Sequence, residues 1–178
     1  MTQTPETEAE LLRDVLEVVR DLEQAYAARY GQDEARRPED IVTELCGIVR
    51  AAPDYLLLPR LAKRWKLTDE GVVCTAIVLL KCCGLEIDAR LNHVSYLACG
   101  LSPTASGKFR RAIRERRAFG RLVKYCPQDG QLYPSPELIG ELSPDASAME
   151  WDRVQEELDR LPTVDDGRDG QVPTRPNP

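Results

Sequence analysis

Apolar residues in the first part of the chain recur at intervals of three and four, the spacing of an amphipathic helix. Thr7 and Glu10 form a capping-box pattern ahead of this run. The run continues through the apolar residues Leu11, Val15, Val18, Leu22 and Tyr26. We predict one long helix that ends near Gly31. Two alternatives stay open for this helix. Its acidic outer face is exposed to solvent, or its narrow apolar stripe, flanked by charged residues, contacts a partner helix.

Three more helices are expected in the first half of the chain. Pro38 stands at a first-turn position of one helix, and a short helix covers about 55–65. Thr68 then caps segment 72–83, the most apolar of the chain, which ends at Gly84. Apolar side chains fill more than one face of this segment, so we expect it to be buried.

The pattern changes in the second half, where helices are followed by an extended segment. Helices are predicted over 91–99 and about 104–118. Residues 121–126 and 131–133 read as strands on either side of the turn Pro127-Gln128-Asp129-Gly130. Together they predict a β-hairpin directly after a helix.

The C-terminal part is predicted to hold one or two helical turns over 136–142 and a last amphipathic helix over 146–161 that carries Trp151. From Pro162 onward Pro, Gly and Asp dominate, which is typical of a disordered tail. The predicted units are an acidic N-terminal helix (1–37), a winged-helix-like domain (38–142), a C-terminal helix (143–161) and a tail (162–178).

The order helix, helix, helix, hairpin over 68–133 is the order that a winged helix requires. The predicted fold class is therefore mainly α: a winged-helix-like bundle with one small β-hairpin, plus flanking N- and C-terminal helices.

Composition narrows the class of protein. The chain has 178 residues and is 42% hydrophobic, enough for a core, and its net charge of -6 argues against a uniformly basic coat for nucleic acid. No run approaches the roughly 18 apolar residues that span a bilayer, and the N-terminus is polar and acidic, so we expect a soluble, cytoplasmic protein without a membrane partner. The six cysteines are interpreted as reduced thiols.

Positive charge is concentrated in one stretch. Between Gly107 and Lys124, eight Lys and Arg residues stand against the single acid Glu115. On a helix, Phe109 and Ile113 can face the core while basic residues at intervals of three face solvent. The candidate nucleic-acid-binding residues are Lys108, Arg110, Arg111, Arg114, Arg117, Arg121 and Lys124.

Two interpretations of this stretch stay open. In a docked winged helix, the helix before the wing enters the major groove, where Arg and Lys meet phosphates and guanine edges, and wing cations reach the backbone or minor groove. Alternatively, the basic helix pairs with the acidic N-terminal helix or with Glu137 and Glu141, within the chain or across a dimer. The expected partner is thus duplex DNA or a protein, and the terminal helices are candidates for homodimerisation.

A resemblance enters at the same residues, through the runs Leu61-Ala62-Lys63-Arg64-Trp65-Lys66-Leu67-Thr68, Lys108-Phe109-Arg110-Arg111, Arg121-Leu122-Val123 and Tyr133-Pro134-Ser135-Pro136. Over about 58–142 these runs, with the apolar helix between them, resemble the winged-helix segments that precede the ATPase module in some bacterial AAA+ proteins. The sequence shows no nucleotide-binding module, so the resemblance implies a stand-alone relative or an accessory that partners such an ATPase. It implies neither ATP hydrolysis nor a catalytic residue.

Catalytic patterns fail on their spacing. Ser106-Gly107-Lys108 is similar to the end of a phosphate-binding loop, but the preceding glycine, Gly100, is too far away and Phe109 replaces the magnesium-binding hydroxyl. Cys82 and Cys83 are adjacent, the other cysteines are scattered, and His93 is the single histidine, so no zinc spacing is present. We predict a non-enzymatic protein with no catalytic residue, no metal site and no cofactor.

Overall fold

The computed structural model describes residues 4–28 and 36–142. These residues are mainly helical with one small antiparallel hairpin, which confirms the predicted fold class at that level. The elements in chain order are α1 (Glu8–Ala28), α2 (Pro38–Ala51), α3 (Leu57–Arg64), α4 (Asp69–Cys82), α5 (Leu91–Cys99), α6 (Pro103–Arg114), the 3-10 helix η1 (Ala118–Arg121), β1 (Val123–Tyr125), β2 (Leu132–Pro134) and α7 (Pro136–Leu142). The predicted helix over 146–161, the tail from 162 and the predicted end of the first helix near Gly31 lie outside the described residues.

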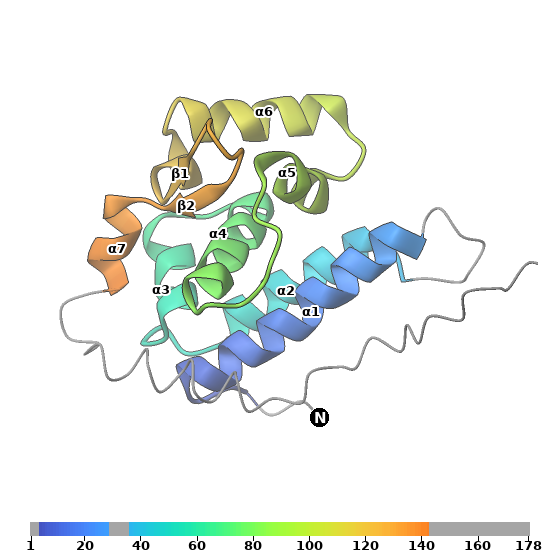
Figure 1. Ribbon diagram of the computed structural model, residues 1–178. Helices are drawn as coiled ribbons and strands as arrows, with labels where there is room; N and C mark the ends of the chain where they lie inside the picture. Colours follow the sequence, from blue (N-terminus) through green and yellow to red (C-terminus); the bar gives the residue numbers. More distant parts are fainter. Residues whose placement is uncertain (1–3, 29–35, 143–178) are drawn as a thin grey trace, which may run out of the picture.

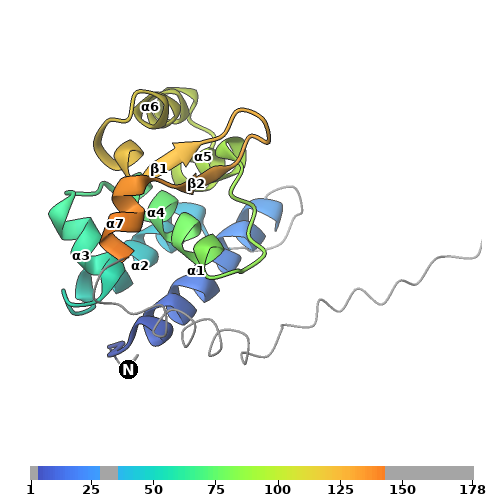
Figure 2. The same ribbon diagram turned by 60° about the vertical axis from the view of Figure 1, so that its left-hand side comes forward.

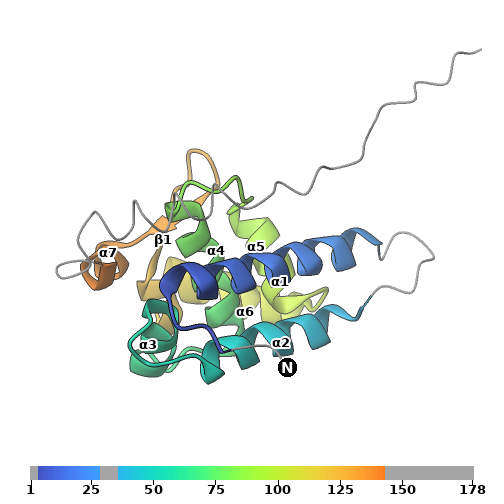
Figure 3. The same cartoon turned by 90° about the horizontal axis from the view of Figure 1, so that it is seen from below.

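The first helix begins as its sequence predicts. The Thr7 hydroxyl accepts a hydrogen bond from the Glu10 N–H at 3.2 Å, and the Glu10 carboxylate accepts one from the Thr7 N–H at 3.2 Å. This reciprocal pair is the capping box. Beyond it, α1 buries ten residues, and it lies antiparallel beside α2 (Figure 3). The buried face of α1 joins the same hydrophobic core as α4 and α5.

Helix α4 forms the centre of the molecule. It lies between the α1–α2 pair and the hairpin, and it also contacts α3 and α5 (Figure 1). Ten of its fourteen residues are buried, from Gly71 through Leu80, as its apolar sequence predicts. The Thr68 hydroxyl accepts a hydrogen bond from the Gly71 N–H at 3.3 Å, so Thr68 caps the helix as expected.

The hairpin is joined to the segment between α4 and α5. Strands β1 and β2 pair antiparallel, with Lys124 opposite Tyr133. The Leu132 N–H donates to the Ala89 carbonyl at 2.8 Å, and the Leu91 N–H donates to the Gly130 carbonyl at 2.9 Å. The residues just before α5 therefore pair with the hairpin through a single β-bridge, Arg90 to Gln131, which the sequence pattern did not predict.

Helix α6 ends earlier than predicted. The prediction of a helix over about 104–118 is wrong at its C-terminus, because the helix ends at Arg114 and Arg116 takes a positive φ of 52°. The Arg116 N–H donates to the Ile113 carbonyl at 3.2 Å, and the Arg117 N–H donates to the Ala112 carbonyl at 2.8 Å. These two bonds form a Schellman motif that closes the helix. The chain then turns back through η1 into β1.

Helix α7 follows the hairpin over the predicted segment 136–142. Its start is fixed by Ser135, a buried residue whose hydroxyl accepts a hydrogen bond from the Leu138 N–H at 3.2 Å. Across the described part of the chain, no helix combines the length and apolar character needed to cross a membrane.

Candidate nucleic-acid interface

Helix α6 separates its apolar and basic residues onto two faces. Phe109 and Ile113 are 3% and 2% exposed and contact the core, while Lys108, Arg111 and Arg114 are exposed on the other side. Ser102 begins the helix, because its hydroxyl accepts a hydrogen bond from the Ala105 N–H at 3.3 Å. The helix lies along the edge of the molecule away from α1 and α2 (Figure 1).

Four of the seven predicted cations are exposed and keep their charge uncompensated within the described residues: Lys108, Arg111 and Arg114 on α6, and Lys124 on β1. No carboxylate of residues 4–28 or 36–142 forms an ion pair with any of the four. We call these four residues the basic face. Seen along the axis of α6, the loop of the hairpin reaches up beside the helix (Figure 2). The hairpin and α6 thus form neighbouring parts of one surface.

Two predicted residues already have partners inside the protein. The Arg117 Nε lies 3.0 Å from the Glu115 carboxylate, in a pair whose arginine side chain is 76% exposed. Arg121 places its guanidinium carbon 5.2 Å from the centre of the Trp65 ring, in a cation–π contact between η1 and the end of α3. A partner would have to share both residues with these contacts.

Arg110 does not belong to the outer surface of α6. Its side chain is half-buried, and its Nε is buried without a hydrogen-bond partner in the described structure. Its positive charge acts on Cys99 at the end of α5, where it lowers the thiol pKa against the larger effects of burial and of Glu70. It lies next to Phe109 on the inner side of the helix, so its inclusion with the outward cations followed from charge alone.

The hairpin carries positive charge at its base and negative charge at its tip. Lys124 is exposed on β1, whereas the turn 127–130 contains Asp129 and no cation. The Asp129 carboxylate accepts hydrogen bonds from the Tyr133 hydroxyl at 2.6 Å and the Gln131 N–H at 2.9 Å. Both bonds lower the pKa of Asp129 below its ordinary value of 3.8, and the bond from Tyr133 has the larger effect. The negative turn is therefore built into the hairpin structure.

In the described part of the chain, the ion pairs of the basic stretch involve residues that follow α6, and not the exposed cations of α6 itself. The Arg116 Nη2 lies 2.6 Å from the Glu137 carboxylate, which joins the end of α6 to α7, and Arg64 of α3 lies 2.7 Å from Glu141. The predicted pairing with Glu137 therefore involves Arg116, a residue that was not among the seven candidates. Within the described residues, the acidic side chains of α1 form no ion pair with the cations of α6.

No protein-family model, curated protein or solved structure matches this chain. The assignment of a function therefore depends on the chemistry of these side chains.

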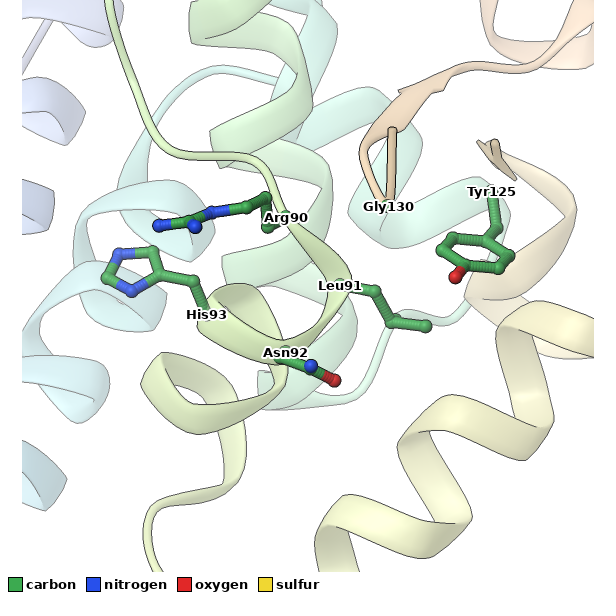
Figure 4. A pocket seen from close by; sticks show the side chains of 6 residues that line it. All are labelled: Arg90, Leu91, Asn92, His93, Tyr125 and Gly130. Carbon is green, nitrogen blue, oxygen red and sulfur yellow. The ribbon is translucent and has the colours of Figure 1, made fainter. Parts of the chain in front are cut away.

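Two hollows flank the hairpin, and Tyr125 lines both of them. One, of about 320 Å³, lies between the first turn of α5 and the turn of the hairpin. Figure 4 shows Arg90 and His93 directed to the side of α5 away from Tyr125. Arg90 is held by Asp88 at 2.5 Å and His93 by Glu23 at 3.1 Å, so this hollow offers little unpaired charge.

The second hollow, of about 370 Å³, lies between the end of α6, β1 and the start of α7. Arg114, Arg116 and Lys124 line it together with apolar side chains. Arg114 and Lys124 were both predicted as candidate binding residues, but their helical and strand spacing did not predict a hollow between them. The early end of α6 is what creates it, because the chain folds back there beside β1.

Five of the six thiols are poor nucleophiles in this structure, because their pKa values are raised. Burial raises the pKa of Cys46 and of Cys83 to about 12 and that of Cys99 to about 11. Burial also raises the pKa of Cys74, and partial desolvation raises that of Cys82, although Cys82 is exposed. Among the residues that the structure describes, no group of three or more His, Cys, Asp and Glu side chains is arranged to hold a metal ion.

Proposed function

We propose that this protein is a non-enzymatic, cytoplasmic winged-helix protein that binds duplex DNA through α6 and the base of the hairpin. The observation that carries the proposal is the basic face: Lys108, Arg111, Arg114 and Lys124 are exposed on adjoining elements without an ion-pair partner among the described residues. Cations that repel one another at this density reduce stability unless an anion offsets them, and the phosphates of a duplex supply that anion.

The arrangement of elements supports this proposal. Helix α4 is followed by the residue Arg90, which forms a β-bridge with Gln131, then by helices α5 and α6 and the hairpin β1–β2. This is the order of elements in a winged helix. In that docking mode α6 enters the major groove, where arginine binds guanine edges and phosphates. Lys124 then contacts the phosphate backbone beside the groove.

A second candidate is a protein-interaction adaptor, such as an accessory that partners an AAA+ ATPase. Two features favour it: the hairpin turn carries Asp129 and no cation, and Leu101, next to the start of α6, is 66% exposed. A negative turn repels a phosphate backbone, and an exposed leucine is suited to an apolar surface.

A salt-dependent titration of a fluorescent duplex with the full chain tests the first proposal, after a size measurement has established the oligomeric state. Binding through phosphate contacts makes log affinity fall with log salt, at a slope of about -0.9 for each neutralised phosphate. Reversing Arg111 and Arg114 to Glu should lower affinity by roughly 100-fold and reduce the slope by about 2. Binding of the reversed variant with wild-type affinity, or no binding of the wild type at low salt, refutes DNA binding.

The matched control reverses two exposed arginines outside α6 and the hairpin, Arg20 of α1 and Arg37 at the start of α2. Arg20→Glu with Arg37→Glu changes the net charge by the same amount, so a specific basic face predicts only a small effect on affinity. An equal loss in both variants would show that net charge, and not α6, governs binding.

A further inference from the structure

The hollow between the end of α6, β1 and the start of α7 combines two kinds of surface. Ile113 and Val123 are 2% and 1% exposed and give it an apolar lining, to which Pro136 adds. Tyr125, half-buried, contributes an aromatic ring to its wall. Its volume of about 370 Å³ falls within the range of small-molecule sites, about 300–1,000 Å³.

Three cations line the same hollow. Arg114 and Lys124 form no ion pair with a described residue, and Arg116 is paired with Glu137 at 2.6 Å. Three positive charges therefore face one carboxylate, which leaves the hollow suited to an anion with two negative charges. Guanidinium groups recognise phosphate oxygens through directed hydrogen bonds, and lysine contributes a point charge.

We propose that this hollow binds a small phosphate ester that carries an aromatic or apolar group of roughly nucleotide size. A DNA backbone needs only exposed cations on an outer surface, whereas this site adds apolar walls behind its cations. The phosphate lies against Arg114, Arg116 and Lys124, and the organic group contacts Ile113, Val123 and the Tyr125 ring. Because Arg114 and Lys124 also belong to the basic face, such a ligand competes with a duplex, and this one consequence rests on the proposed function.

The test titrates the isotope-labelled full chain with phenyl phosphate and, separately, with inorganic phosphate, and follows backbone amide signals by NMR. We expect saturable shifts at Ile113, Val123 and Tyr125, and about tenfold tighter binding of phenyl phosphate, because its ring buries apolar surface that inorganic phosphate lacks. The absence of saturable shifts at these residues, or equal affinity for the two compounds, overturns the proposal.

Variants separate the hollow from general electrostatics. Arg114→Gln with Lys124→Gln should weaken phenyl phosphate binding at least about tenfold, whereas Arg20→Gln with Arg37→Gln, which removes the same charge elsewhere, should leave it unchanged. Equal effects of the two pairs overturn the proposal. Glu137→Gln releases Arg116 from its ion pair and should tighten binding several-fold, a gain that a misfolded variant could not produce. Weaker binding by that variant counts against the site.

The duplex titration makes the two proposals separable. A protein that binds phenyl phosphate at these residues but no duplex retains the small-molecule site and refutes DNA binding. A protein that binds a duplex through Arg111 and Arg114 but shows no saturable response to phenyl phosphate refutes only the small-molecule site.

Discussion

Gly120 lies directly against the backbone of Ala112: a Cβ atom built on Gly120 would stand 2.1 Å from the Ala112 carbonyl oxygen. The contact is backbone to backbone, so no side-chain rotation relieves it. Gly120→Ala must move η1 away from α6, and we expect it to lower the free energy of unfolding by more than about 2 kcal/mol. Urea unfolding followed by circular dichroism measures this change.

Two other helical glycines provide the matched control. A Cβ at Gly107 of α6 or at Gly47 of α2 would meet nothing within 4 Å, and both residues are exposed. Gly107→Ala and Gly47→Ala should each raise the free energy of unfolding by about 0.5–1 kcal/mol, because alanine is the better helix former. A Gly120→Ala variant as stable as these two would show that η1 does not pack as described.

Arg110 can be separated from its outward neighbour Arg111 by substitution. Arg110→Met keeps an unbranched side chain as far as the position of Nε and replaces that atom, which is buried without a partner in the described structure, with a methyl group. We expect stability to stay the same or rise by up to about 1 kcal/mol, and duplex affinity to change by less than about twofold. Arg111→Met, by contrast, should reduce duplex affinity by roughly tenfold at low salt. Equal losses in fluorescence-anisotropy titrations would contradict the inward placement of Arg110.

Helix ends illustrate which parts of the fold the sequence could predict. Three helices close with a Schellman motif, whose positive-φ residue is Lys66 after α3, Gly84 after α4 and Arg116 after α6. The end at Gly84 was predicted correctly because glycine marks it. The end of α6 was missed because an arginine occupies that position, and nothing in the local pattern separates it from the helix before it.

For the basic face too, the sequence predicts local features of the helix but not tertiary contacts. Helical spacing predicted correctly that Lys108, Arg111 and Arg114 face solvent while Phe109 and Ile113 are buried. Whether a cation keeps its charge free depends on distant residues, as the pairing of Arg116 with Glu137 and the stacking of Arg121 on Trp65 show. Periodicity within one helix carries no information about those tertiary contacts.

Lys81 joins the hairpin to the central helix. Its Nζ lies 2.7 Å from the Gln131 side-chain oxygen and 4.8 Å from the centre of the Tyr133 ring. Lys81→Met removes both contacts, and we expect it to lower the free energy of unfolding by about 1 kcal/mol. Hydrogen exchange of the Leu132 amide, which bonds to the Ala89 carbonyl, should accelerate several-fold, while exchange in α1 should not.

The matched substitution for Lys81→Met is Lys63→Met, since Lys63 is an exposed lysine of α3 that pairs with Asp54 and does not contact the hairpin. Surface pairs of this kind contribute little, so its effect on the Leu132 amide should be negligible. If both variants accelerate exchange at Leu132 equally, Lys81 does not hold the hairpin.

The buried thiols of Cys46 and Cys83 should react slowly in the folded protein. At pH 8 a thiol whose pKa is about 12, as for Cys46 and Cys83, is present as thiolate in only about one molecule in ten thousand. Titration with a thiol reagent at pH 8 should therefore leave these two cysteines unmodified over the time in which urea-unfolded protein reacts completely. Rapid labelling of either one in the native protein, identified by mass spectrometry, would contradict their burial.

Acid should loosen the hairpin turn at a pH set by Asp129. Its carboxylate accepts bonds from the Tyr133 hydroxyl and the Gln131 N–H, so its pKa in the folded chain lies below the ordinary 3.8. A depressed carboxyl pKa contributes stability that is complete above the unfolded value and is lost as the pH falls through the folded value. The Gln131 amide signal should therefore titrate with a midpoint below 3.8, and Asp129→Asn should abolish that titration. A midpoint at or above 3.8 in the wild-type protein would mean that the carboxylate does not hold the turn together.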